Sequence, residues 1–337
     1  MNKMIIRTTR LFAFLLALSL SFASAKAADW YVKTTGNNAT GTGSAASPYR
    51  TITFAISKAA PGDVIHIGTG TFTEQVEIAK NLTLIGEGPA ATIIAAPATL
   101  PVSFYRDIQY LPLVYAHDAA NVVIKNLSAD GNTFESATAA FAGIAYSQAG
   151  GLVDNVKIST APNPVPYSNQ LGYGFLANAD NNTARNITLS NSTIISYQRF
   201  AAGFLGKDLT GTADGNTILG AGKTDAVTQN GILVSLQAAA TVKNNTIKNF
   251  MYTGGNLTAI GIYAIDAKPV TITGNQLTDC QTAIFCINST GTQITQNRIV
   301  FNAATYDDNI DYSWGVLVEK GNYTVSQNEI DGGGEGT

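Results

Sequence analysis

The sequence is poor in the residues that metal binding and charge-based recognition usually require. Its 337 residues include two histidines, two cysteines and two tryptophans, and only 13% of all residues are charged. So few thiols and imidazoles argue against a zinc site, and we expect His66 and His117 to be solvated or locally bonded. A net charge of −3 argues against nucleic acid as the main partner.

The two cysteines, Cys280 and Cys286, lie six residues apart and leave two alternatives open. They could form a disulfide in an exported protein, or each could be a small buried core residue. Their spacing alone does not decide between the two.

The sequence also lacks a hydrophobic run long enough to span a membrane. The apolar run from Leu11 to Phe22 has 12 residues, whereas a spanning helix needs roughly 20. Lys3, Arg7 and Arg10 precede this run and small residues follow it, so residues 1–27 are predicted to be a cleavable signal peptide. We therefore expect a secreted, periplasmic or cell-surface protein in which residues 28–337 form one domain.

Two strand signals alternate along the chain from Gly143 onward, which is typical of a solenoid. The first is a Gly or Ala followed by apolar residues, and it occurs at Gly143, Gly174, Gly203, Gly231, Gly261, Ala283 and Gly315. The second is Asn-x-Ile or Asn-x-Leu, and it occurs at Asn216, Asn245, Asn275, Asn297 and Asn328. The repeat predicts an all-β chain of stacked coils, with the asparagines in left-handed backbone positions and forming a ladder between coils.

Period-two alternation in the first signal divides each strand into two faces. If Ile232, Ile262 and Ile284 face the core, an apolar column should face outward, formed by Ala145, Leu176, Leu205, Leu233, Tyr263, Phe285 and Leu317. We expect loops to cover this column, because a long exposed apolar stripe favours aggregation. The alternative is an exposed contact patch.

The spacing between the two signals predicts where the loops lie. Weaker forms of the second signal end at Ile158 and Ile194. From the Gly or Ala of the first signal to the Ile or Leu that ends the second, the spacing is 15 or 16 residues in six of seven coils, whereas the return segment varies from 6 to 16. Insertions confined to one arc should form loops on one side of the solenoid, which is often the binding side.

The N-terminal part of the domain is predicted to cap the first coil. Apolar residues at helical spacing from Thr51 to Ala59, ended by Pro61-Gly62, predict a short helix over the open end of the first coil. Strands should follow at 64–67, 75–78 and 82–85. The cap is therefore assigned to residues 28–62 and the coils to residues 63–337, with a C-terminal end that we expect to be either truncated or a flexible join to a further region.

Several segments near the N-terminus resemble secreted right-handed parallel β-helix proteins of the pectin-lyase-like superfamily. They are Trp30-Tyr31-Val32, Pro48 to Ile52, Pro61 to Val64, Gly70 to Glu74 and Leu82 to Gly88. The resemblance implies a single-stranded right-handed parallel β-helix but no particular activity. Asp307-Asp308 is the only Asp-Asp pair, and the Gly-His-Gly, Asp-Pro-His and Gly-Arg-Pro-Trp segments of the enzymatic subfamilies are absent.

Aromatic and charged residues in the variable arc, together with Tyr263 of the outward column, are the best candidates for a ligand site. Flat rings suit stacking on sugar faces, and neighbouring carboxylates could bond hydroxyl groups. The alternative is that these rings only cover the apolar column. The candidates are Tyr197, Arg199, Tyr252, Tyr263, Asp307, Asp308, Tyr312 and Trp314.

These observations favour a β-helix protein that binds a polysaccharide or cell-surface glycan, with no catalytic residue assigned. One alternative is a pectate-lyase-like polysaccharide lyase acting on uronic-acid polymers, which would require Ca2+; otherwise no metal or cofactor is expected. The other is a structural or adhesin-like surface protein. We expect a monomer or a part of a longer chain, without a membrane span.

Overall fold

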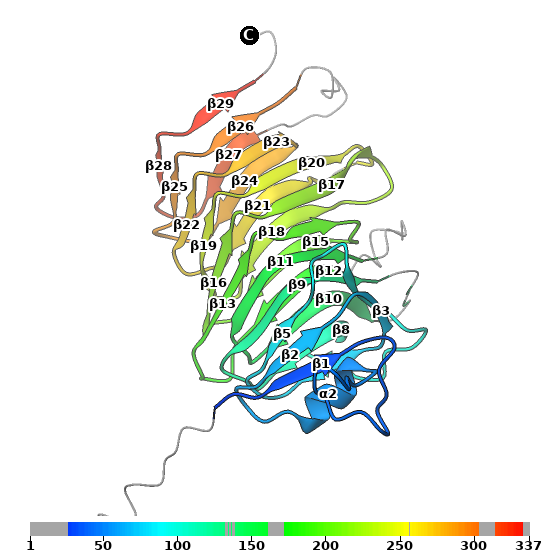
Figure 1. Ribbon diagram of the computed structural model, residues 1–337. Coiled ribbons are helices and arrows are strands. Elements are labelled where there is room, and N and C mark those ends of the chain that lie inside the picture. The colour runs from blue at the N-terminus through cyan, green and yellow to red at the C-terminus, as the bar shows by residue number, and fades with distance from the viewer. Residues whose placement is uncertain are drawn as a thin grey trace, which may run out of the picture.

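The computed structural model describes residues 26–332, except 132–133, 135, 137–138, 161–171, 256 and 303–313. The chain winds through successive coils, and each coil contributes one strand to each of three faces. The coils stack into one elongated body with β1 and α2 at one end and β29 at the other (Figure 1). The prediction of an all-β parallel β-helix is confirmed.

The first face consists of parallel strands stacked from coil to coil. Its outward positions carry a row of threonines, Thr188, Thr212, Thr241 and Thr271, which are β-branched and suit a half-exposed strand surface. Its strands are β1 (Asp29–Val32), β2 (Val64–Ile67), β5 (Thr83–Ile85), the first parts of β9 (Val122–Asp130) and β11 (Gly151–Ser159), β13 (Arg185–Ser190), β16 (Leu209–Asp214), β19 (Ala239–Lys243), β22 (Val270–Thr273), β25 (Gln293–Thr295) and β28 (Thr324–Ser326).

The second face follows the asparagine turn. It joins the first face in one 19-stranded sheet, because β9 and β11 run through the bend between the two. Its other strands are β3 (Gly70–Thr73), β6 (Thr92–Ala95), β14 (Thr193–Ile195), β17 (Thr217–Thr224), β20 (Thr246–Tyr252), β23 (Gln276–Cys280), β26 (Arg298–Val300) and β29 (Glu329–Asp331).

The third face is a separate ten-stranded sheet, and the Gly signals of most later coils lie in its strands. Nine strands are parallel, and β7 (Phe104–Tyr105) pairs antiparallel with β8. The parallel strands are β4 (Val76–Ile78), β8 (Gln109–His117), β10 (Ala140–Ser147), β12 (Tyr173–Asn178), β15 (Phe200–Leu205), β18 (Asn230–Ser235), β21 (Ile260–Ile265), β24 (Thr282–Ile287) and β27 (Trp314–Glu319).

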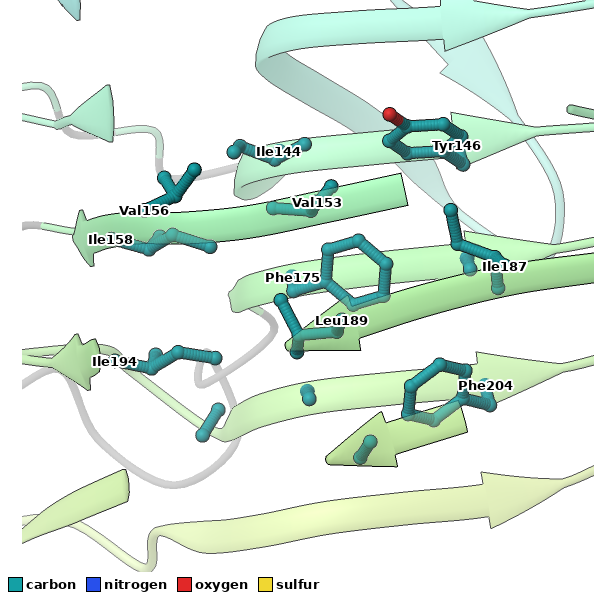
Figure 2. Close-up of a cluster of buried hydrophobic side chains, with 14 of the residues drawn as sticks. Ile144, Tyr146, Val153, Val156, Ile158, Phe175, Ile187, Leu189, Ile194 and Phe204 are labelled. Carbon is teal, nitrogen blue, oxygen red and sulfur yellow. The ribbon is translucent and has the colours of Figure 1, made fainter. Parts of the chain in front are cut away.

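The core lies inside the three faces and is built from vertically aligned apolar side chains. Ile232 pairs with Ile262 and Ile262 with Ile284, and all three are fully buried, as predicted. Figure 2 shows side chains of the three faces meeting in the same interior, with the rings of Tyr146, Phe175 and Phe204 in successive coils. The Tyr146 hydroxyl donates to the Val122 carbonyl at 3.0 Å, so this buried polar group is satisfied.

The structure also answers the question of the cysteines. Cys280 and Cys286 are free and buried, which confirms the core alternative. The two histidines are locally bonded: His66 to Asp29 at 2.8 Å, and His117 to Glu77 at 3.0 Å and Asp118 at 2.9 Å.

The predicted capping helix is α2 (Ile52–Lys58), and Thr51 accepts a hydrogen bond from the Phe54 amide as its N-cap. Ile52, Ala55 and Ile56 are buried against the first coil. The strand predicted at 64–67 is found at those residues, and those predicted at 75–78 and 82–85 begin one residue later. Among the described residues, no helix is both long and apolar enough to cross a membrane.

Candidate functional site

The outer surface of the third face is the part of the molecule that combines aromatic rings with loops. The described segments that join the second face to the third include 196–199 and 225–229, and they lie on one flank of the stack (Figure 1). The two longest predicted return arcs lie largely outside the described residues.

Strand register defines the central outward column of the third face. It runs through Tyr115, Ala145, Leu176, Gly203, Leu233, Tyr263, Phe285 and Leu317. The prediction that Leu205 belongs to this column is wrong, because Leu205 pairs with Ser235 two positions further along. The Gly signal of that coil is Ala201-Ala202, and Gly203 is an outward residue.

Glycine at position 203 has a steric reason. A Cβ there would lie 2.7 Å from Cε1 of Tyr173, which is closer than real side chains approach. The absence of a side chain lets the Tyr173 ring stack on Phe200, with ring centroids 5.2 Å apart. A leucine in the predicted register would fill the space that this ring occupies.

The N-terminal part of this surface is covered by a described segment of the chain. Phe104 stacks on Tyr110 and on Tyr115, with both centroid distances 5.1 Å. Val102 and Ile108 pack against the same outer cluster, in which Leu176 is fully buried. Coverage by a loop is therefore confirmed for these coils, where the apolar column is not an open contact patch.

The C-terminal part of the surface is more open. Tyr263 in β21 stacks on Phe285 in β24, with ring centroids 5.3 Å apart and planes 9° apart, and both residues are half-buried. Trp314 begins β27 in the neighbouring column, pairs with Thr282 and is 44% exposed. We call Tyr263, Phe285 and Trp314 the aromatic platform.

A polar cluster lies beside the covered part of the same surface. The Tyr110 hydroxyl donates to Asp107 at 3.1 Å, and the Asp107 carboxylate lies 3.5 Å from Nη1 of Arg106. Arg199, half-buried, places its guanidinium 5.3 Å from the Phe200 ring centroid. We call Arg106, Asp107, Tyr110, Tyr173 and Arg199 the arginine–tyrosine cluster.

The cluster couples two phenols to two guanidinium groups. Burial raises the pKa of Tyr173 to about 12, and the charges of Arg199 and Arg106 partly oppose that rise. Burial also raises the pKa of Tyr110 well above its usual range. Both phenols are therefore protonated near neutral pH and can donate hydrogen bonds, while the guanidinium groups favour an anionic partner.

The structure separates the predicted site residues into three groups. Arg199, Tyr263 and Trp314 lie on the outer surface of the third face or at its edge. Tyr197 and Tyr252 are core residues, with 1% and 9% of their surfaces exposed, so their rings do not reach a glycan at the surface. Asp307, Asp308 and Tyr312 fall outside the described residues.

Tyr197 points inward because its loop crosses the gap between the second and third faces. Its hydroxyl has no hydrogen-bond partner among the described residues, and burial raises its pKa well above the usual range. Tyr252 donates to the Gly254 carbonyl at 3.3 Å. These two residues correct the assumption that loop aromatics face outward.

Sequence reasoning left some residues of this surface out of the site. The sequence places Phe285 in the outward column one coil above Tyr263, and this position is the signal that could identify the stacked pair. Arg106, Asp107 and Tyr110 follow no repeat signal, so only the folded chain brings them next to Tyr173. Among the described residues, no group of three or more His, Cys, Asp or Glu side chains could hold a metal ion.

Comparison with known families gives two matches. The model of the right handed beta helix region matches residues 112–299 and, in a second alignment, 173–337. A model described as a protein of unknown function (DUF1565) matches residues 34–87. No curated protein sequence matches the chain.

Several solved structures are similar to the chain. A lacto-N-biosidase from Eubacterium ramulus aligns with a TM-score of 0.51 at 13% identity, over 90% of this chain and 67% of its own. An alginate lyase from Paenibacillus aligns with a TM-score of 0.43 at 13% identity, over 82% and 96% of the two chains. A pectin methylesterase in complex with a hexasaccharide aligns with a TM-score of 0.35 at 12% identity, over 90% and 92%. At such identities the likeness concerns the fold.

Proposed function

We propose, on the premise that this chain belongs to the right-handed β-helix family, that it is an exported protein that binds a polysaccharide through the outer surface of its third face. The observation that carries the proposal is the stacked, half-buried pair of Tyr263 and Phe285, together with the 44% exposed Trp314 at the start of the next strand of the same face.

The aromatic platform suits a chain of sugar rings for geometric reasons. Strands of neighbouring coils lie about 4.8 Å apart, so Tyr263 and Phe285, which occupy one column in successive coils, form a short row of two rings. Such a row offers apolar contact to the flat C–H face of a sugar, and it does not require charge on the ligand. The fold likeness to a lacto-N-biosidase, a protein that acts on carbohydrate, is consistent with this class of ligand.

The binding test compares platform variants with a matched aromatic elsewhere. Tyr263→Ala combined with Trp314→Ala removes two rings worth about 1 kcal/mol each, so retention in gels containing pectin, alginate or a glycosaminoglycan should weaken roughly tenfold or more. Tyr31→Ala is the control, because Tyr31 stacks on His66 on the first face and should leave retention unchanged. Undiminished retention by the double variant would remove the platform from the proposal.

A lyase acting on uronic-acid polymers is the second candidate, and the arginine–tyrosine cluster favours it. Arg199 and Arg106 could neutralise a sugar carboxylate, the Asp107 carboxylate could accept the C5 proton, and a protonated Tyr173 could donate a proton to the leaving C4 oxygen as the C4=C5 double bond forms. A lyase would release products with a new double bond, which absorb ultraviolet light, when incubated with pectin or alginate in the presence of Ca2+. Arg199→Ala should abolish this ultraviolet absorbance. Binding without product would support a binding module, and the absence of both binding and product would support a structural or adhesive role.

Export is proposed from the predicted signal peptide. Mass spectrometry of the protein recovered outside the cytoplasm should find an N-terminus at Lys26 or Ala28, after cleavage behind Ala25 or Ala27. An uncleaved N-terminus at Met1 would contradict the proposal.

A further inference from the structure

We propose that the signal peptide is removed between Ala27 and Ala28, and that the new α-ammonium group of Ala28 forms an ion pair with the buried carboxylate of Asp63. The inference rests on the proposed export. It goes further, because it assigns the processed N-terminus a structural role in fixing the first strand of the solenoid.

The carboxylate of Asp63 already binds the residue that precedes β1. Its Oδ1 accepts a hydrogen bond from the Ala28 backbone nitrogen at 2.8 Å. Its Oδ2 accepts hydrogen bonds from the indole of Trp30 and from the Ala60 amide, both at 2.8 Å. The Val64 amide donates to the Ala28 carbonyl at 2.9 Å, in register with the pairing of β1 and β2 at the capped end of the stack (Figure 1). The Ala28 nitrogen is therefore held at contact distance from a carboxylate.

That carboxylate is charged but has no cation at contact distance. Asp63 is only 5% exposed, and burial alone would raise its pKa. The hydrogen bonds that it accepts and the charge of Lys80 nevertheless hold the pKa below its usual range. Within the described ranges no ion pair includes Asp63, and the Lys80 ammonium donates instead to the Ala59 carbonyl. Because buried charges are normally paired, a cation is favoured at the Ala28 nitrogen.

Cleavage behind Ala27 produces that cation. The endopeptidase that removes the signal peptide hydrolyses the peptide bond with one water, which leaves a carboxylate on Ala27 and an ammonium group on Ala28. A free α-amino group has a pKa of about 8, so it is mostly protonated near neutral pH. The hydrogen bond to Asp63 becomes charge-assisted and roughly twice as strong. Ala28 is itself exposed, so its other N–H groups can bind water.

The alternative cleavage behind Ala25 produces no such pair. It leaves Lys26 and Ala27 as two exposed residues ahead of Ala28, whose nitrogen remains a neutral amide. Mass spectrometry of the protein exported from the full-length precursor should therefore find Ala28 as the first residue. A first residue of Lys26 would leave the proposed export intact and overturn this inference. Retention of Met1 would overturn both.

A second experiment compares chains that begin at Ala28 and at Lys26, each released from an N-terminal fusion by a protease. Asp63→Asn removes the charge and keeps the shape. It should raise the unfolding equilibrium constant, measured in urea, about fivefold more in the chain that begins at Ala28. Asp214→Asn is the control, because Asp214 pairs with Lys243 at 3.1 Å in a later coil and should act equally in both chains. An equal effect of Asp63→Asn in both chains would overturn the inference.

The unsubstituted chains provide a measurement that does not depend on the folding of a variant. The ion pair should steady the Asp63 carboxylate, so the indole hydrogen of Trp30 should exchange with solvent more slowly in the chain that begins at Ala28. Trp314 is the other tryptophan of the protein and is 44% exposed, so its indole hydrogen should exchange at the same rate in both chains. Equal exchange rates at Trp30 would contradict the ion pair.

Discussion

At the scale of single residues, the buried asparagines explain why one residue type recurs at one place in successive coils. The side-chain amide of Asn245 donates to Asn275 Oδ1 at 2.9 Å and to the Ala213 carbonyl at 3.0 Å. Its own Oδ1 accepts hydrogen bonds from the backbone and side-chain nitrogens of Asn216, both at 2.9 Å. The predicted ladder is confirmed, because the asparagine satisfies polar groups on the coils above and below it.

One detail of that prediction is wrong. The left-handed backbone position belongs to the residue before each ladder asparagine, such as Asn244 with φ 56° or Gly274 with φ 66°. The preceding residue makes the bend between the first and second faces, and this turns the ladder asparagine into the interior.

Replacing Asn245 by Ala should destabilise the protein strongly. The substitution leaves the Asn216 amide and the Ala213 carbonyl buried without these partners, at a cost of about 2–3 kcal/mol in the free energy of unfolding. Urea denaturation followed by circular dichroism measures the change. The exposed Asn186→Ala variant is the control, and an equal loss of stability in both variants would contradict a role for the ladder.

At the scale of elements, the capping helix depends on a residue from a strand-flanking turn of the same coil. The two oxygens of Glu74 accept hydrogen bonds from the amides of Ile52 at 2.8 Å and Thr53 at 2.9 Å. The Thr53 hydroxyl donates to the same carboxylate at 2.6 Å. Helical spacing in residues 51–59 predicts the helix, but it does not reveal that Glu74, far along the chain, binds its first turn.

Glu74→Gln should therefore loosen α2 without unfolding the coils. The neutral amide has one oxygen instead of two and lacks the charge that favours the N-terminus of a helix, so we expect a loss of about 1 kcal/mol. Hydrogen exchange should become faster in residues 52–58 and remain unchanged in the strands β18 to β24. Unchanged exchange in the helix would show that packing alone holds it in place; Glu87→Gln, an exposed position, is the matched control.

At the scale of the whole molecule, buried phenols make stability depend on alkaline pH. Burial raises the pKa of Tyr115 and of Tyr173 to about 12, and it raises the pKa of Tyr146 further. In the unfolded chain the pKa of a tyrosine phenol is about 10. Because the folded pKa lies above the unfolded one, this stability is complete below about pH 10 and is lost as the pH rises towards about 12.

The free energy of unfolding, measured by urea denaturation, should accordingly fall between about pH 10 and about pH 12, by roughly 1.4 kcal/mol per pH unit for each buried phenol. Tyr146→Phe should make the slope shallower, although it also removes the hydrogen bond to Val122. Tyr105→Phe, at an exposed position, should leave the slope unchanged. A flat profile over this range would mean that the phenols ionise without unfolding.

The sequence by itself determined the repeating unit of this protein. Period-two alternation and the recurring Gly and Asn signals depend on local backbone geometry, so they identify the strands, the inward isoleucines and the ladder. The same reasoning found the capping helix and placed Tyr263 and Phe285 in one outward column. These features repeat in many coils, and repetition compensates for the weakness of each single signal.

Only the tertiary structure decided the features that occur once. Ala201-Ala202 replaces the Gly signal in β15, and Gly203 is free of a side chain because the Tyr173 ring needs that space. Tyr197 turns into the core, whereas Arg199, two residues later, lies at the edge of the outer surface. Loop residues have no periodicity to fix their direction, so the packing of neighbouring coils determines which side chains a ligand could reach.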